Sequence, residues 1–83
     1  MTSFFNPEAT ALHNQVIGTF CRIASIRSAR LTLFLSEFGI MPGTTLRVVA
    51  KMPGKGPVAL ETGDFKFCIR YEDADCIAVE PIV

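Results

Sequence analysis

The sequence predicts a mainly β domain, a small and partly open barrel of about five short strands with one inserted α-helix. Three features lead to this prediction. Apolar residues recur at two-residue spacing in several short runs, which is typical of half-buried strands. Glycine and proline separate these runs, as expected for tight turns. Helical spacing of apolar residues occurs in one stretch, near the middle of the chain.

Residues 10–83 are expected to form the barrel, and residues 1–9 an N-terminal extension. The extension contains Phe4 and Phe5 without a clear period, so it either stays flexible or packs these rings on the barrel. At the start of the domain, Thr10 is expected to cap a single turn.

The first strand is expected at residues 19–26. Ile23 and Ile26 are expected to point inward, and the step between them breaks strict alternation. An extra residue in a strand produces such a break, so the sequence predicts a β-bulge here.

The inserted helix is expected at about residues 29–38. Ser28 can cap its start, because the hydroxyl can accept a hydrogen bond from a backbone N–H of the first turn. Gly39 lies where helices commonly end with a left-handed residue, and Ile40 can then fold back onto Leu35. The stripe predicted to be buried consists of Leu31, Phe34, Leu35 and Phe38.

The remaining strands are expected at residues 44–51, 58–61, 65–70 and 76–80. Phe65, Phe67 and Ile69 give the clearest two-residue period in the chain. The loop at residues 52–57 contains proline and glycine, which exclude a central strand there. Residues 71–74 are expected to form a turn before the last strand.

Composition limits the class of protein. The chain has 83 residues, 49% hydrophobic and 19% charged, so one folded domain is expected rather than disorder. Its net charge is zero, which argues against nucleic-acid binding. No apolar run reaches membrane-spanning length and no signal-peptide pattern occurs, so a cytoplasmic protein is expected. Cys21, Cys68 and Cys76 lack framework spacing and are expected to be reduced thiols.

No enzyme chemistry is predicted. The single histidine, His13, has no second base with which to build a nucleophilic triad, and an exposed turn residue is the favoured interpretation. The Gly-Lys-Gly run at residues 54–56 does not fit a phosphate-binding loop, because Pro57 and a strand follow it. We therefore expect neither catalytic nor cofactor-binding residues.

A metal site is a second interpretation of two cysteines. Cys68 and Cys76 are expected on the strands at either side of the turn at residues 71–74. They could be neighbours there, and His13 or Asp75 could complete a site for a soft metal. Two small side chains at the barrel surface are the favoured interpretation, since a CxxC pair and a second histidine are missing. Ligand spacing thus does not support iron or another divalent metal as a cofactor.

Residues 35–43, Leu-Ser-Glu-Phe-Gly-Ile-Met-Pro-Gly, resemble the core of the FeoA family, written LxELGxxPGxxVxVV. Residues 63–70 resemble the GxxxxLR segment of that family, and residues 72–80 resemble its xEAxxIxVE segment. Upstream, the family's opening L…G…V..I is matched by Leu12, Gly18, Ile23 and Ile26. The ordered set of segments, rather than any one of them, carries the resemblance.

The resemblance implies an SH3-like barrel and a role beside FeoB, the bacterial ferrous-iron transporter. We therefore expect a cytosolic adaptor that contacts the GTPase region of a FeoB-like transporter and reaches the membrane only through it. Two alternatives stay open: a small transition-metal-binding protein, and a module acting in trans like the SH3-like domain of iron-dependent repressors. Self-association as a homo-oligomer also stays open.

The surface predicted to contact the partner consists of Leu33, Glu37, Met41, Met52 and Lys55. Leu33 is apolar on the outward face of the helix, and methionine side chains adapt to partner surfaces. A competing interpretation places Leu33 under the N-terminal phenylalanines. FeoA proteins usually carry basic residues near this point, so the chain departs from the family here, and the departure argues against carrying over an electrostatic contact by the helix.

Overall fold

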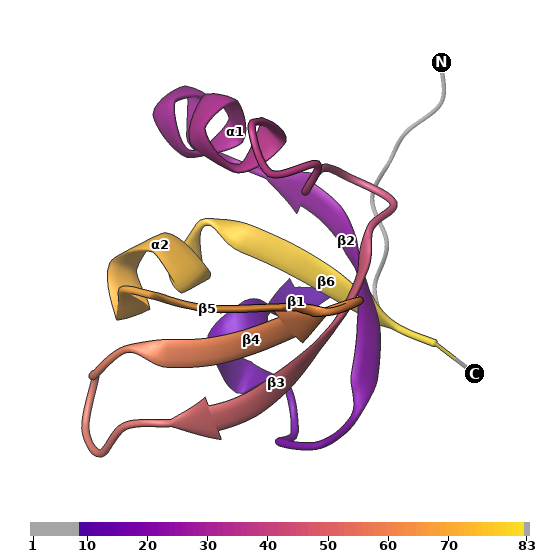
Figure 1. Cartoon of the computed structure of the whole chain (residues 1–83). Coiled ribbons are helices and arrows are strands. Elements are labelled where there is room, and N and C mark those ends of the chain that lie inside the picture. Colours follow the sequence, from indigo (N-terminus) through magenta and orange to yellow (C-terminus); the bar gives the residue numbers. More distant parts are fainter. Residues whose placement is uncertain (1–8, 83) are drawn as a thin grey trace.

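The computed structural model describes residues 9–82, which form one antiparallel sheet with a helix packed over one end (Figure 1). The strands pair in the order β1-β6-β2-β3-β4-β5. The strands are Thr10–Ala11 (β1), Phe20–Ile26 (β2), Thr45–Lys51 (β3), Val58–Thr62 (β4), Phe65–Ile69 (β5) and Ile77–Pro81 (β6). The helices are Leu12–Asn14 (η1, a 3₁₀ turn), Ala29–Ser36 (α1) and Tyr71–Asp75 (α2). The predicted mainly β fold with one inserted helix is confirmed, and the predictions for Phe4 and Phe5 lie outside the described residues.

Strand β1 is the element that the sequence did not predict. Thr10 pairs with Val79 and Ala11 with Ala78, so this short segment extends the sheet beside β6. The following 3₁₀ turn begins after Ala11 and has no side-chain cap, so the prediction that Thr10 caps a turn is wrong. Two residues are too few to show strand periodicity, and their pairing depends on a partner strand far away in the sequence.

The curled sheet encloses one apolar core. Every element except β1 contributes a buried side chain, and no polar or charged residue is buried among the described residues. The core consists of Leu12, Cys21, Ile23, Leu31, Leu35, Ile40, Leu46, Val48, Val58, Leu60, Ile69, Ala74, Ile77 and Val79. For so short a chain, a single continuous core is the arrangement that covers the most apolar surface.

Strand β2 contains the predicted bulge. Its pairing with β6 shifts register between Ile23 and Ser25, so two successive inward positions lie three residues apart. Ile23 is buried, and Ile26 packs partly buried against the core. The bulge therefore lets one strand keep both isoleucines on the core side.

Helix α1 begins and ends as the sequence predicts. The Ser28 hydroxyl accepts a hydrogen bond from the backbone N–H of Leu31 at 3.1 Å. At the other end Gly39 adopts a φ of +77°. The N–H of Ile40 donates to the carbonyl of Leu35 at 3.0 Å, which is the return contact of a Schellman motif. Regular helix ends at Ser36, slightly earlier than predicted, and a turn continues to Gly39.

The predicted burial of the helical phenylalanines is wrong. Leu31 and Leu35 face the core, but Phe34 and Phe38 are 49% and 50% exposed. An eight-residue helix on the end of a sheet presents only a narrow line of residues to the core. Phe34 and Phe38 lie at the flank and end of α1, beside the edge strand β5, where the described residues form no further layer over them. No helix in the described part of the chain is long and apolar enough to span a membrane.

Candidate functional site

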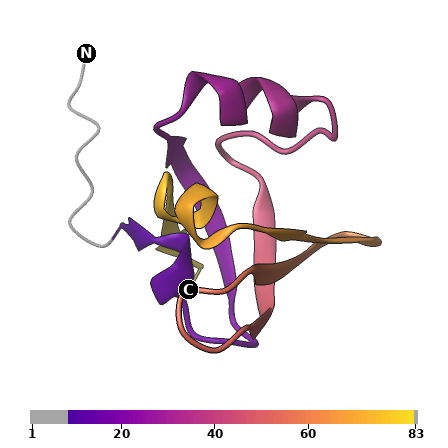
Figure 2. The same ribbon diagram turned by 90° about the vertical axis from the view of Figure 1, so that its left-hand side faces the viewer.

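An open groove of about 420 Å³ separates α1 from the segment that runs from β5 into α2. Its lining residues are Arg30, Leu31, Phe34, Cys68, Ile69, Arg70 and Asp73. Leu31 and Ile69 are buried and form the apolar base, whereas the polar side chains come from the start of α1 and from α2 and its N-cap. Figure 2 shows the β4–β5 hairpin projecting below the level of α1. The groove therefore combines an apolar base with a charged end.

Four phenylalanines extend the apolar surface of the groove; Phe34, Phe38, Phe65 and Phe67 are here called the aromatic row. Phe34 and Phe38 meet edge to face, with ring centroids 5.4 Å apart. Phe38 stacks on Phe65 at 5.4 Å, and Phe65 stacks on Phe67 at 5.2 Å. Such pairs contribute about 0.5–1.5 kcal/mol beyond simple burial, so the row holds the end of α1 against β5.

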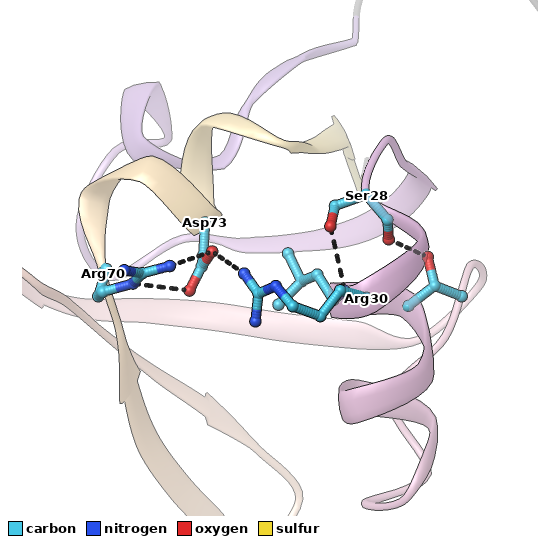
Figure 3. A network of polar contacts seen from close by, with 6 residues as sticks. Ser28, Arg30, Arg70 and Asp73 are labelled. Carbon is cyan, nitrogen blue, oxygen red and sulfur yellow. Dashed lines mark hydrogen bonds and ion pairs between the residues drawn. The ribbon is translucent and has the colours of Figure 1, made fainter.

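Asp73 links the two sides of the groove. Its Oδ1 accepts hydrogen bonds from Arg30 at 3.2 Å and from Arg70 at 3.3 Å, and its Oδ2 accepts a third from Arg70 at 3.3 Å. Figure 3 shows the carboxylate between the two guanidinium groups. The hydrogen bond with Asp73 is the main cause of a raised pKa of Arg70. One carboxylate thus balances two arginines at the end of the groove.

Local backbone structure places Asp73 for this role. The carbonyl of Arg70 accepts hydrogen bonds from the N–H groups of Asp73 at 3.1 Å and of Ala74 at 3.0 Å, which closes the first turn of α2. The fully buried Ala74 anchors that turn on the core. An acidic residue in the first turn of a helix is also favoured by the helix dipole. The segment that the sequence predicts as a turn, residues 71–74, therefore includes a side chain with a defined contact across the groove.

A separate polar cluster joins η1 to α2. Nε2 of His13 lies 2.8 Å from Oδ1 of Asp75, and the His13 ring stacks on Tyr71 with centroids 4.3 Å apart. The hydrogen bond with His13 is the main cause of a lowered pKa of Asp75. Lys55 lies over the other ring of the pair, 5.8 Å from the Tyr71 centroid. These contacts fasten the start of the domain and the β3–β4 loop to α2.

The predicted partner-contact residues fall into two separate groups. Leu33, Glu37 and Met41 are exposed on α1 and on the loop that leads into β3. Met52 and Lys55 are exposed in the β3–β4 loop, at the opposite end of β3 (Figure 1). The structure therefore does not bring all five onto one surface.

The sequence analysis also missed several groove residues. Phe34 was assigned to the core, and neither Arg30 nor Arg70 was considered. The excess of phenylalanine on one helix and one strand was the signal available for the aromatic row, because burying all of it would need a larger core.

The candidate metal ligands are not brought together. Cys68 is exposed in β5, whereas Cys76 is partly buried against the core at the end of α2. His13 instead contacts Asp75. Within residues 9–82, no three histidine, cysteine, aspartate or glutamate side chains form a group that could hold a metal ion. The candidate functional site is therefore the apolar groove and not this set of predicted metal ligands.

Comparison with known proteins identifies relatives of the whole domain. A family model described as FeoA domain matches residues 10–81. No curated protein matches the chain. A crystal structure of an iron uptake regulatory protein, FeoA, is 26% identical with a TM-score of 0.75, and the match covers 89% of this chain and 97% of that chain.

Two further structures are informative about the fold. The zinc complex of FeoA from Stenotrophomonas maltophilia, described as an SH3 domain protein, is 25% identical with a TM-score of 0.73 over 86% of this chain and 89% of that chain. A manganese-dependent transcriptional repressor with manganese is 21% identical with a TM-score of 0.81 over 93% of this chain and 38% of that chain. The second likeness concerns the fold alone, and both agree with the SH3-like barrel expected from the sequence.

Proposed function

The chain belongs to the FeoA family, which is associated with ferrous-iron transport, and we propose that it acts by contact with the cytoplasmic GTPase region of a FeoB-like transporter. The FeoA domain is a small domain associated with transport, and the family is not a known enzyme family. The proposed protein is an adaptor in the cytoplasm that reaches the membrane through the transporter. Its contact surface is the groove between α1 and β5 together with the aromatic row and the adjoining exposed Leu33.

The observation that carries this proposal is the apolar surface on the α1–β5 flank. Phe34, Phe38 and Phe65 are exposed there although they contact one another, and Leu33 is 68% exposed on the neighbouring face of α1. Contiguous exposed apolar surface is typical of protein-binding sites, and aromatic and arginine side chains dominate binding energy at such sites. The flank contains both kinds of residue.

Binding at this surface can act on the partner without any chemistry in the adaptor. A ligand that binds one conformation of a two-state protein better than the other shifts the population toward that conformation. A tenfold difference in affinity, about 1.4 kcal/mol, changes the ratio of the two states tenfold. The proposed role therefore needs a surface that distinguishes two states of the GTPase region, and needs no catalytic group.

A small transition-metal-binding protein is the alternative. The zinc complex of a FeoA protein supports it, whereas the described residues of this chain provide no group of three candidate ligands. Stoichiometric metal in protein purified without added metal, retained after dialysis, would favour that alternative. Metal-free protein that still binds the GTPase region would favour the adaptor.

Titration calorimetry with the GTPase region of a FeoB-like transporter from the same organism tests the proposal. Leu33→Glu places a charge on the exposed face of α1 next to the groove, and a loss of affinity of about tenfold or more is expected. Val16→Glu is the matched control, because Val16 is 66% exposed and lies in the β1–β2 connection instead. Equal affinity of wild type and Leu33→Glu would rule out this face as the contact surface.

A further inference from the structure

The groove has an uneven balance of charge. Arg30 and Arg70 both depend on Asp73, and their side chains are 67% and 66% exposed, compared with 16% for Asp73. The distances to Asp73 are 3.2 Å and 3.3 Å, longer than the 2.7–2.9 Å of strong charge-assisted hydrogen bonds. The two guanidinium groups therefore keep donors for a second carboxylate.

Other arginines in the described chain are paired differently. Arg22 contacts Glu80, and Arg27 contacts Asp75, which His13 also contacts. Arg47 and Lys66 share Glu61. At the groove, by comparison, two arginines share the carboxylate of Asp73.

Neighbouring acidic residues leave this surplus in place. Glu72 is the smallest of the influences on the pKa of Arg70, and the hydrogen bond with Asp73 is the largest. Glu37 is the C-cap of α1, and within residues 9–82 it forms no ion pair with either groove arginine. Arg30 and Arg70 together therefore carry one positive charge more than the Asp73 carboxylate that they share.

Apolar and cationic side chains lie next to each other along α1. Arg30 and Phe34 are one helical turn apart and lie on the same side, and both line the groove with Leu31. Across the groove, Ile69 and Arg70 likewise place an apolar and a cationic residue next to each other. A ligand that uses both parts must carry an anionic group and a bulky apolar group about one residue apart.

We infer that the groove recognises a protein segment in which a glutamate or aspartate lies next to a large aliphatic or aromatic side chain. The carboxylate of that segment binds Arg30 and Arg70 in the place that Asp73 leaves open. The apolar side chain packs on Leu31, Phe34 and Ile69. This inference rests on the proposed function, because it specifies the chemistry of the partner segment at the same groove.

Short blocked peptides test the inference directly. The probe is a Gly/Ser peptide with a central Leu-Glu-Leu, and the matched peptides replace the glutamate by glutamine or both leucines by serine. Binding is followed by NMR through the methyl groups of Leu31 and Ile69 and the Nε–H groups of Arg30 and Arg70. A short segment should bind with a dissociation constant of about 0.1–1 mM. The glutamine and serine peptides should each bind at least about threefold more weakly.

Protein variants separate the groove from general charge effects. Arg30→Gln should weaken binding of the Leu-Glu-Leu peptide at least about threefold and reduce its dependence on salt. Arg22→Gln is the matched control, because it removes an arginine from a different part of the sheet and should leave binding unchanged. Inorganic phosphate is the comparison anion, and it should not displace the peptide at equal concentration.

Two results would overturn the inference: equal binding of the glutamate and glutamine peptides, or displacement by phosphate at equal concentration. Failure of the Leu-Glu-Leu peptide to compete with a GTPase region that binds the groove would also overturn it, while the proposed function would stand. If the Leu-Glu-Leu peptide binds as expected but the GTPase region does not bind, the inference is supported and the GTPase region is ruled out as the partner.

Discussion

Substitution of Gly39 tests how the chain stops α1 and places its exposed face. Gly39 adopts a φ of +77°, a backbone conformation that costs a residue with a Cβ atom about 1–2 kcal/mol. A Cβ atom built at this position would meet no atom within 4 Å, so the cost arises from the backbone alone and not from a clash. Gly39→Ala should therefore lower the free energy of unfolding by about 1 kcal/mol, and the β-branched Gly39→Val by about 2 kcal/mol.

These energies convert to shifts in melting temperature that are easy to measure. For a domain of this size, 1 kcal/mol corresponds to roughly 4–8 °C. Gly39→Asn should lose less than Gly39→Ala, because asparagine tolerates the left-handed conformation better. Ser36→Ala is the control for a change in the last turn of α1 that leaves the stop intact, and its melting temperature should stay close to that of wild type.

Thermal and urea unfolding followed by circular dichroism provide the assay, with the urea m-value expected to be unchanged across the series. Melting temperatures of Gly39→Ala and Gly39→Val that equal wild type would refute the reasoning. A Gly39→Asn variant as unstable as Gly39→Val would also refute it. That result would show that the loss of stability does not depend on how well the residue tolerates a left-handed backbone conformation.

Further predictions concern the cap of α1 and two titrating groups. Ser28→Ala removes the N-cap and should cost about 1 kcal/mol in urea unfolding, whereas a loss below about 0.3 kcal/mol would contradict the capping role. Burial raises the pKa of Cys21 from 9.0 to about 11, so at pH 8 a disulfide reagent should modify the exposed Cys68 and leave Cys21 unmodified until the protein unfolds; equal rates would contradict its burial. The hydrogen bond with His13 lowers the pKa of Asp75 below its usual 3.8. This pair therefore stabilises the fold fully at pH values above the usual pKa, and the stabilisation is lost as the pH falls through the lowered pKa of the folded protein. A carboxyl NMR titration should show that shift in wild type and its reduction in His13→Ala, and an identical midpoint in both would contradict the assignment.

The sequence was most informative where structure is determined by neighbours along the chain. Ser28 and Gly39 mark the ends of α1 through hydrogen bonds to residues within one or two turns, so their roles can be read from spacing. The bulge in β2 was visible for the same reason, since the positions of Ile23 and Ile26 alone break alternation.

Features that depend on distant segments were predicted less well. Phe34 and Phe38 have helical core spacing, but their burial depends on whether another layer lies beside β5, and residues 9–82 provide none. The pairing of β1 with β6 brings together residues far apart in sequence, and helical or strand periodicity cannot reveal it.

The candidate site was predicted in part for the same reason. The sequence left open whether Leu33 is exposed on α1 or packed under the N-terminal phenylalanines, and in the structure it is exposed. Grouping Leu33 with Met52 failed to anticipate that α1 precedes β3 at one end, whereas Met52 lies in the loop at the opposite end of β3. Arg30 and Arg70 acquire a common role only through Asp73, and that contact crosses from α1 to α2.

Residue-resolved NMR of the isotopically labelled protein, titrated with the GTPase region of a FeoB-like transporter, tests the central claim most directly. We predict that amide shifts cluster on residues 30–41 and 65–73, which contain the groove and the aromatic row. Residues of the β1–β2 connection and the β3–β4 loop should be unaffected. Shifts concentrated on the β3–β4 loop, or none at a saturating partner concentration, would contradict the claim that this protein works through the α1–β5 groove.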